Sequence, residues 1–261
     1  MEPRIGAAQH RSLLDPLPDS PHDELTINSP IPTLIKPMKI LAIISQKGGV
    51  GKTTVATSLA VAAELAGQRV ALFDLDDQAS AAFWGGLREK RGVVTPVIRD
   101  VKMALLERDL ERARNAEADL VILDCPPVQG AAITAANHAD FVLIPTKTDI
   151  LDIRSMRSTV ALMQSINKRL SVVLTFCPPI GAEVDQARQL IAGLGAELAP
   201  VEIHQRKAYA RAQQDGQTVQ EYEPTGKAAA EVTELYSYIH KHLHGKAHGK
   251  ATAKAKSARG V

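Results

Sequence analysis

The stretch that decides the fold is SQKGGVGKTT, residues 45–54. Phosphate-binding loops ordinarily read Gly, any four residues, Gly-Lys and then Ser or Thr. Counted back from Lys52, the first position of that pattern is Gln46 instead of glycine, and Lys47 adds a second lysine. The stretch therefore predicts a phosphate-binding loop of an unusual kind, and the second lysine calls for an explanation.

The surroundings of this loop favour phosphate binding over a chance glycine-rich turn. An apolar run expected to be a strand, residues 40–44, precedes it, and a helical pattern, residues 52–66, follows it. Glycines let the backbone turn its N–H groups toward phosphate oxygens, and the helix N-terminus adds positive potential. Lys52 is expected to bridge the β- and γ-phosphates, and the Thr53 hydroxyl to hold Mg²⁺. The expected nucleotide-binding residues are Lys47, Gly48, Gly49, Val50, Gly51, Lys52, Thr53 and Thr54.

Two further motifs place aspartates at the ends of predicted strands. In FDLDDQAS, Asp74 and Asp76 point the same way, because side chains alternate along a strand. Paired carboxylates are costly unless a cation or a water to be activated uses them. The alternative interpretation is a polar turn in which Asp77 caps the next helix. In VILDCPP, Asp124 alone ends an apolar strand, as expected of a residue that binds Mg²⁺ through water in a phosphate-loop NTPase.

Apolar runs alternate with helical patterns along the chain from residue 39. Strands are expected at 40–44, 70–73, 120–123, 141–144 and 171–175, and helices at 52–66, 79–90, 131–138, 150–166, 184–194 and 226–243. Continuous apolar strands separated by helices are typical of a parallel sheet that is covered on both faces. The sequence predicts an α/β fold of the P-loop NTPase type: a doubly wound, mostly parallel sheet with helices on both faces.

Composition divides the chain into three parts. Residues 1–38 hold seven of the fifteen prolines and are expected to form a disordered leader, residues 39–243 the folded phosphate-loop domain, and residues 244–261 a basic disordered tail. The two cysteines form no metal-binding or disulfide pattern, which favours a reducing, cytoplasmic compartment. No stretch approaches the ~18 apolar residues of a membrane span, so no membrane association is expected.

The motifs KGGVGKTT, FDLDDQAS and VILDCPP resemble the deviant Walker A, A′ and B motifs of the ParA/MinD family of ATPases. The resemblance implies ATP with Mg²⁺ as ligands and an ATP-sandwich homodimer. It also accounts for the second lysine, because Lys47 would reach across the dimer to the partner's phosphates while Lys52 serves its own nucleotide. Asp76 would position or activate the attacking water, with Asp74 near the metal and Asp124 holding it through water.

Two positions depart from the family pattern. Asp77 stands where the family usually has proline, and Cys125 stands where it usually has threonine. Neither aligns with a catalytic position, and Cys125 is expected to be a small buried residue.

A later segment, residues 206–227, resembles the small ParA-type partition ATPases that lack an N-terminal DNA-binding domain. If it is helical, Lys207 and Arg211 share one face, with Arg206 and Lys227 nearby. This reading predicts nonspecific binding of double-stranded DNA through phosphate contacts. The alternative is a solvated helix with scattered charges. A membrane-binding relative would need an amphipathic C-terminal helix, and no large apolar residue lies between Leu243 and Val261.

The expected function is that of a nucleoid-associated partition ATPase, released from DNA when a ParB-like partner stimulates slow ATP hydrolysis. Two alternatives stay open. One is a positioner of a non-DNA cargo, such as a protein array or microcompartment. The other is an ATP-dependent metabolic ligase on a related fold, which would need a substrate pocket and no DNA.

Overall fold

A parallel sheet forms the centre of the computed structural model, which describes residues 37–245. Seven of the eight strands in this range follow the order β3-β2-β4-β1-β5-β6-β7, and β8 pairs with β6 outside this order. All pairings among them are parallel. The strands are β1 (Lys39–Ile43), β2 (Val70–Asp74), β3 (Val97–Asp100), β4 (Leu120–Asp124), β5 (Phe141–Thr146), β6 (Leu170–Cys177), β7 (Glu197–Leu198) and β8 (Ile203–His204).

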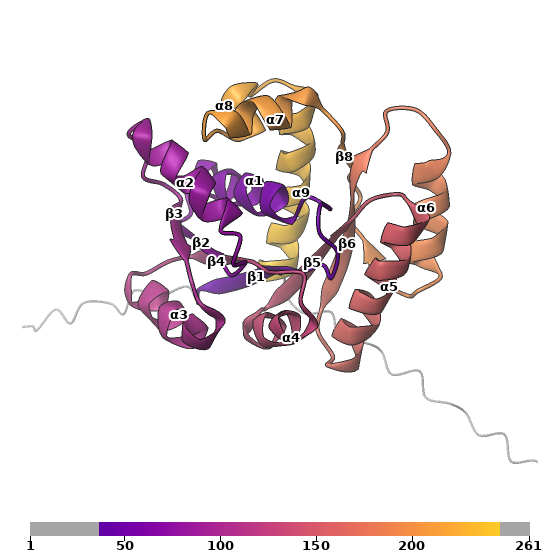
Figure 1. Ribbon diagram of the computed structural model, residues 1–261, viewed down its shortest axis with the longest axis horizontal. Coiled ribbons are helices and arrows are strands. Elements are labelled where there is room, and N and C mark those ends of the chain that lie inside the picture. The colour runs from indigo at the N-terminus through magenta and orange to yellow at the C-terminus, as the bar shows by residue number, and fades with distance from the viewer. Residues whose placement is uncertain (1–36, 246–261) are drawn as a thin grey trace, which may run out of the picture. The chain divides into compact units, whose positions relative to one another are not determined.

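Helices cover both faces of this sheet (Figure 1). They are α1 (Lys52–Leu65), α2 (Ser80–Lys90), α3 (Leu106–Asn115), α4 (Gln129–His138), α5 (Ile150–Ser165), α6 (Glu183–Ala192), α7 (Lys207–Gln214), α8 (Val219–Tyr222) and α9 (Lys227–His244). Alternation along β1 shows how the core divides. Ile40 and Ala42 pack with residues of α3 to α6, whereas Leu41 and Ile43 pack with α1, α9 and the start of α8. The doubly wound parallel fold is thereby confirmed.

Two elements, β3 and α3, are not predicted by the sequence pattern. Strand β3 is exposed along most of its length, so it lacks the apolar run by which the other strands were recognised. Helix α3 buries three apolar side chains, Leu106, Leu110 and Ala113, together with Asp109, and its other residues are mostly charged. Because most residues of α3 are charged, the helical spacing of its three buried apolar positions is not apparent in the sequence.

The predicted leader, residues 1–38, and the predicted basic tail, residues 244–261, lie almost entirely outside the described residues. Strand β1 begins at Lys39 and α9 ends at His244. Between residues 37 and 245, no helix combines the length and the apolar character needed to cross a bilayer.

Candidate nucleotide-binding site

The loop between β1 and α1 has the backbone that its glycines predicted. Gly49 and Gly51 have φ values of 71° and 84°, in the left-handed region that favours glycine. Gly51 caps α1, and a Cβ there would lie 3.1 Å from the ring of Phe176. The loop is also fastened to β6, because Thr175 Oγ1 donates a hydrogen bond to the carbonyl of Val50 at 2.9 Å. The sequence thus builds a tight, anchored turn that leads directly into a helix N-terminus.

The two lysines of the loop behave differently. Lys52 is buried, and its Nζ donates to the carbonyl of Lys47 at 3.3 Å, so its ammonium group folds back over the loop. Lys47 is more exposed, and its Nζ forms an ion pair with Asp152 Oδ1 of α5 at 2.9 Å. In this single chain, therefore, Lys47 is bound to its own subunit and does not extend away from it.

Thr53 and Asp124 meet at the start of α1. Thr53 Oγ1 donates a hydrogen bond to Asp124 Oδ2 at 2.6 Å, and Asp124 Oδ1 is buried without a hydrogen-bond partner among residues 37–245. Burial raises the pKa of Asp124 to about 7, although the Thr53 hydrogen bond acts in the opposite direction. A buried oxygen without a hydrogen-bond partner destabilises the folded protein unless a ligand contacts it. The Asp124 carboxylate and the Thr53 hydroxyl together offer oxygen ligands, which Mg²⁺ prefers. Thr53 and Asp124 therefore fit that ion.

The two aspartates of the second motif have different surroundings. Asp74 lies beside Asp124 in the register of β2 and β4, and its carboxylate accepts the backbone N–H groups of Asp76 and Ala82 at 3.2 and 3.0 Å. Burial raises the pKa of Asp74, while these backbone hydrogen bonds lower it. Asp76 is only half-buried, and its Oδ1 accepts the N–H of Gln78 at 3.0 Å. Asp74 therefore shapes the turn, and Asp76 keeps a carboxylate oxygen for other partners.

A cavity of about 520 Å³, which no sequence motif predicted, opens beside the loop. Its lining includes Gly51 and Thr54 of the loop region, Phe176 of β6, and the segment around α7, represented by His204, Tyr209 and Gln213. The volume is in the range of small-molecule sites. These residues come from three separate parts of the chain, and no spacing in the sequence could have linked them.

The predicted DNA-binding residues also separate into two groups. Arg206 forms an ion pair with Glu231 of α9, which also accepts hydrogen bonds from the backbone N–H of His204. Lys207 and Arg211 are exposed on α7, and neither forms an ion pair with another residue of the 37–245 range. Lys227, also exposed, begins α9. The arrangement leaves α7 with two available cations, while Arg206 fixes the turn that precedes it.

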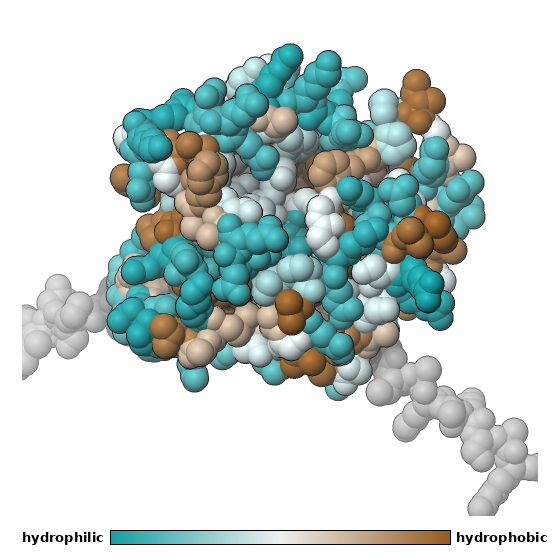
Figure 2. All heavy atoms as spheres, viewed as in Figure 1, coloured by the Kyte–Doolittle hydropathy of each residue, from teal (hydrophilic) through white to brown (hydrophobic). Residues whose placement is uncertain are grey.

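Exposed apolar side chains follow the carboxyl ends of the strands, on the edge of the sheet that carries the loop. Val128 follows β4, Ile150 and Leu151 follow β5, and Ile180 follows β6; their exposed fractions are 58%, 69%, 66% and 90%. Figure 2 shows apolar patches interrupting a largely polar surface, several of them on the α5 and α6 side of the view. Apolar residues gathered in this way favour a protein interface.

Comparison with known proteins agrees with these motifs. Residues 41–219 match the family described as "CobQ/CobB/MinD/ParA nucleotide binding domain". A "Maintenance of carboxysome distribution protein A" of Gloeobacter kilaueensis is 32% identical over 76% of this chain and 90% of its own length. The "Chromosome-partitioning ATPase Soj" of Thermus thermophilus is 27% identical over 72% of this chain and 90% of its own length.

Solved structures show the same fold. The septum site-determining protein MinD of Pyrococcus horikoshii, described as complexed with Mg-ADP, superimposes with a TM-score of 0.64 at 18% identity. The superposition covers 78% of this chain and 97% of that one. Together with the two lysines of the loop and the Thr53–Asp124 contact, the family match identifies the chain: it belongs to the CobQ/CobB/MinD/ParA family of nucleotide-binding proteins.

Proposed function

We propose that the protein is a ParA-type ATPase that forms an ATP-sandwich homodimer, binds double-stranded DNA without sequence preference, and leaves the DNA when a partner stimulates hydrolysis. The observation that carries this proposal is the position of Lys47. It is a second lysine of the phosphate loop, on an edge of the molecule where Val128, Ile150 and Leu151 are exposed. A loop that served one chain alone would need neither the extra lysine nor this apolar surrounding.

The ligands are proposed to be ATP and Mg²⁺. Backbone N–H groups of residues 48–54 would cradle the phosphates, and Lys52 would neutralise their charge from within the loop. Thr53 and Asp124 would hold Mg²⁺, which supplies charge stabilisation at the phosphates. Asp76 is available to orient the attacking water, since it forms no ion pair within residues 37–245. The cavity beside Thr54 and Tyr209 has room for the base and ribose.

Dimerisation requires Lys47 to exchange one partner for another. In the single chain its ammonium group is bound to Asp152 at 2.9 Å. Phosphates of a nucleotide on a second subunit would offer more negative charge than this one carboxylate, so ATP would favour the exchange. The exposed apolar side chains on the same edge would then become buried between the subunits.

Two kinds of cargo are compatible with the proposed ATPase. DNA partition through a ParB-like centromere-binding protein is supported by the similarity to a chromosome-partitioning ATPase, and it implies a cytoplasmic, nucleoid-associated protein. A second candidate, positioning of a protein microcompartment on the nucleoid through an adaptor, is supported by the similarity to carboxysome distribution proteins. Both use the same ATP-dependent dimer on DNA and differ only in the partner.

The dimer is tested by light scattering with ATP. Wild-type protein is expected to change from monomer to dimer when ATP and Mg²⁺ are added. Lys47→Ala should still bind nucleotide but stay monomeric, whereas Lys52→Ala should lose nucleotide binding itself. Lys90→Ala serves as the control, because Lys90 is an exposed lysine of α2. An ATP-dependent dimer of Lys47→Ala would refute the role proposed for Lys47.

The DNA surface is tested by removing the two cations of α7 together. Lys207→Ala/Arg211→Ala should weaken binding to random-sequence duplex DNA and make it less sensitive to salt, by roughly one unit of slope for each lost phosphate contact. Arg108→Ala/Arg114→Ala removes the same charge from α3, which packs on the opposite face of the sheet. Equal weakening by both double variants would show that only overall charge matters.

A further inference from the structure

A hydrogen bond connects α7 directly to the phosphate loop. Gln213 Nε2 donates to Thr54 Oγ1 at 2.9 Å, in the wall of the cavity beside the loop. Gln213 is half-buried in the last turn of α7, two residues beyond Arg211. The helix that presents Lys207 and Arg211 to solvent is therefore in contact with the first turn of α1.

The chemistry of this contact makes it sensitive to a bound phosphate. A threonine hydroxyl has one hydrogen to donate and two lone pairs to accept with. Because the amide of Gln213 occupies a lone pair, the hydrogen of Thr54 remains available for an acceptor in the loop. A hydroxyl that donates to an anion becomes a better acceptor, since consecutive hydrogen bonds polarise one another. A phosphate at Thr54 would accordingly strengthen the bond to Gln213.

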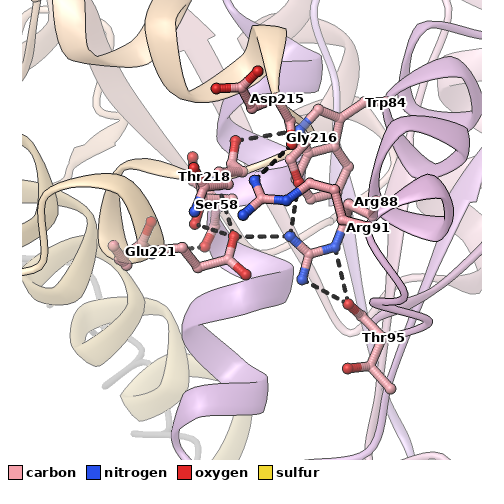
Figure 3. A network of polar contacts seen from close by, with 11 residues as sticks. Ser58, Trp84, Arg88, Arg91, Thr95, Asp215, Gly216, Thr218 and Glu221 are labelled. Atoms are coloured by element: carbon pink, nitrogen blue, oxygen red, sulfur yellow. Dashed lines mark hydrogen bonds and ion pairs between the residues drawn. The ribbon is translucent and has the colours of Figure 1, made fainter.

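Further contacts hold the rest of this region to the two helices that follow the nucleotide motifs. Gln220 Nε2 of α8 donates to the carbonyl of Ser58 in α1 at 2.9 Å. On the α2 side, the buried guanidinium of Arg88 donates to the carbonyl of Gly216 at 2.9 Å and to Glu221 at 2.8 Å (Figure 3). Trp84 Nε1 also donates to the carbonyl of Gln217, at 3.2 Å.

These contacts attach the C-terminal end of α7 to α1, and the turn that follows α7 to α2. Helix α1 begins at the phosphate loop, and α2 begins just after Asp76. Within this region, Gln213 supplies the contact to a residue expected to touch the nucleotide. A change at Thr54 has a direct route to α7, whereas the Arg88 contacts limit how far the turn after α7 can move.

We propose that Gln213 is a positioning residue that makes the order of α7, and with it the DNA-binding surface, depend on whether the phosphate loop is occupied. The proposal rests on the proposed function for its consequence on DNA. Coupling of this kind acts in both directions, so removing the Gln213 amide should also weaken nucleotide binding. Loss of one hydrogen bond of ordinary strength corresponds to about fivefold in affinity.

The test compares Gln213→Leu with Gln214→Leu by hydrogen exchange. Gln214 is the exposed neighbour on the same helix, so the control has the same substitution without the contact. ADP with Mg²⁺ is the probe, because it occupies the loop without the γ-phosphate that the sandwich dimer is expected to require. Denaturant midpoints of both variants, measured alongside, show whether each is folded.

In wild type and Gln214→Leu, ADP is expected to slow amide exchange in residues 207–217. In folded Gln213→Leu it should not, and the dissociation constant for ADP should rise about fivefold. If Gln213→Leu shows the wild-type slowing, or if wild type shows none, the proposal is overturned. If Gln213→Leu does not fold, Gln213→Asn replaces it, since asparagine keeps the amide on a side chain too short to reach Thr54.

DNA binding separates this inference from the proposed function. If the function holds, the ratio of DNA affinities with and without ATP should fall about fivefold in Gln213→Leu and stay unchanged in Gln214→Leu. If wild type binds no DNA, the proposed function fails. The exchange measurement with ADP still decides the role of Gln213.

Discussion

Asp124 shows most clearly that the site is built for a ligand and not for stability. Its carboxylate is buried, one of its oxygens has no hydrogen-bond partner in the part of the chain that the structure describes, and burial raises its pKa to about 7. An isosteric amide would remove the buried charge while keeping an oxygen that can accept from Thr53. The ligand-free protein would gain stability from that change, and the ability to hold Mg²⁺ would suffer.

We therefore expect Asp124→Asn to stabilise the ligand-free protein in a pH-dependent way. Because the folded-state pKa is raised, wild type loses stability as pH rises from about 4 through about 7, and the variant does not. The free energy of unfolding of the variant should exceed that of wild type by on the order of 2 kcal/mol at pH 8.5 and by much less at pH 5. Urea unfolding at both pH values measures this, with the exposed Asp215→Asn as control. An equal gain in the free energy of unfolding at both pH values would show that the buried charge of Asp124 is not its cause. Added Mg²⁺ and ATP should stabilise wild type only.

Asp152 gives a second prediction at the residue scale. Its ion pair with Lys47 holds that lysine in the single chain, so Asp152→Asn should release it at little cost in size. The ATP concentration for half-maximal dimerisation should then fall about threefold, the effect of losing one partly exposed ion pair. Light scattering across an ATP titration measures this, with Asp149→Asn, an exposed neighbour, as control. A higher midpoint in Asp152→Asn would mean that Asp152 supports the dimer.

Motif spacing predicted part of this site, and tertiary contacts supply the rest. The approach of Thr53 to Asp124 follows from the order of strand, loop and helix, because parallel strands bring their carboxyl ends to one edge. Asp152 and Gln213 lie about 100 and 160 residues beyond the loop in the sequence. Nothing local marks either residue, so only the packing of α5 and α7 identifies them.

Among the secondary-structure elements, α2 and α8 depend on each other through Arg88 and Glu221. Arg88 is buried and fully engaged by the carboxylate of Glu221 and by the carbonyls of Gly216 and Thr95 (Figure 3). Burial acts to raise the pKa of Glu221, but the guanidinium of Arg88 and the N–H of Thr218 hold it below its ordinary value. Glu221 also completes the capping box of α8 with Thr218.

We expect Glu221→Gln to destabilise the protein near pH 7 by about 1–3 kcal/mol, because a buried guanidinium loses its charged partner. A lowered pKa means that the carboxylate stabilises the fold above its ordinary titration range and loses this effect as pH falls through that range and below it. The difference between wild type and Glu221→Gln should shrink from pH 7 to pH 3 in urea unfolding. The exposed Glu234→Gln is the control. A difference in unfolding free energy that does not change with pH would mean that altered packing, and not the lost charge, destabilises the variant.

Elements with a continuous apolar run or a clear helical period were predicted well, and those with neither were overlooked. Strands β1, β2, β4, β5 and β6 are buried along most of their length, and the sequence predicts all five. Strands β7 and β8 have two residues each, too few to show a period. The physical reason is the same as for β3 at the sheet edge: an element that buries little leaves little hydrophobic pattern.

At the scale of the whole molecule, the fold separates its tasks between the sheet faces. Helices α1, α2, α7, α8 and α9 gather on one face, so the nucleotide loop, the motif after β2 and the basic helix share a core. The carboxyl edge of the sheet carries the loop and exposed apolar side chains. The alternation of apolar runs and helical patterns predicted the parallel sheet with helices on both faces, and it did not predict the exposed apolar edge. The sequence does not predict the cargo, because in the proposed function a partner protein selects it.

The most direct test of the central claim is binding of the wild-type protein to random-sequence duplex DNA at near-physiological salt, with ATP, with ADP and without nucleotide. We predict tight binding with ATP alone, because the proposed ATP dimer would bring two α7 surfaces together. Binding that is the same in all three conditions, or absent in all three, would contradict the claim. It would reduce Lys207 and Arg211 to solvated surface residues and favour an ATP-dependent ligase on this fold.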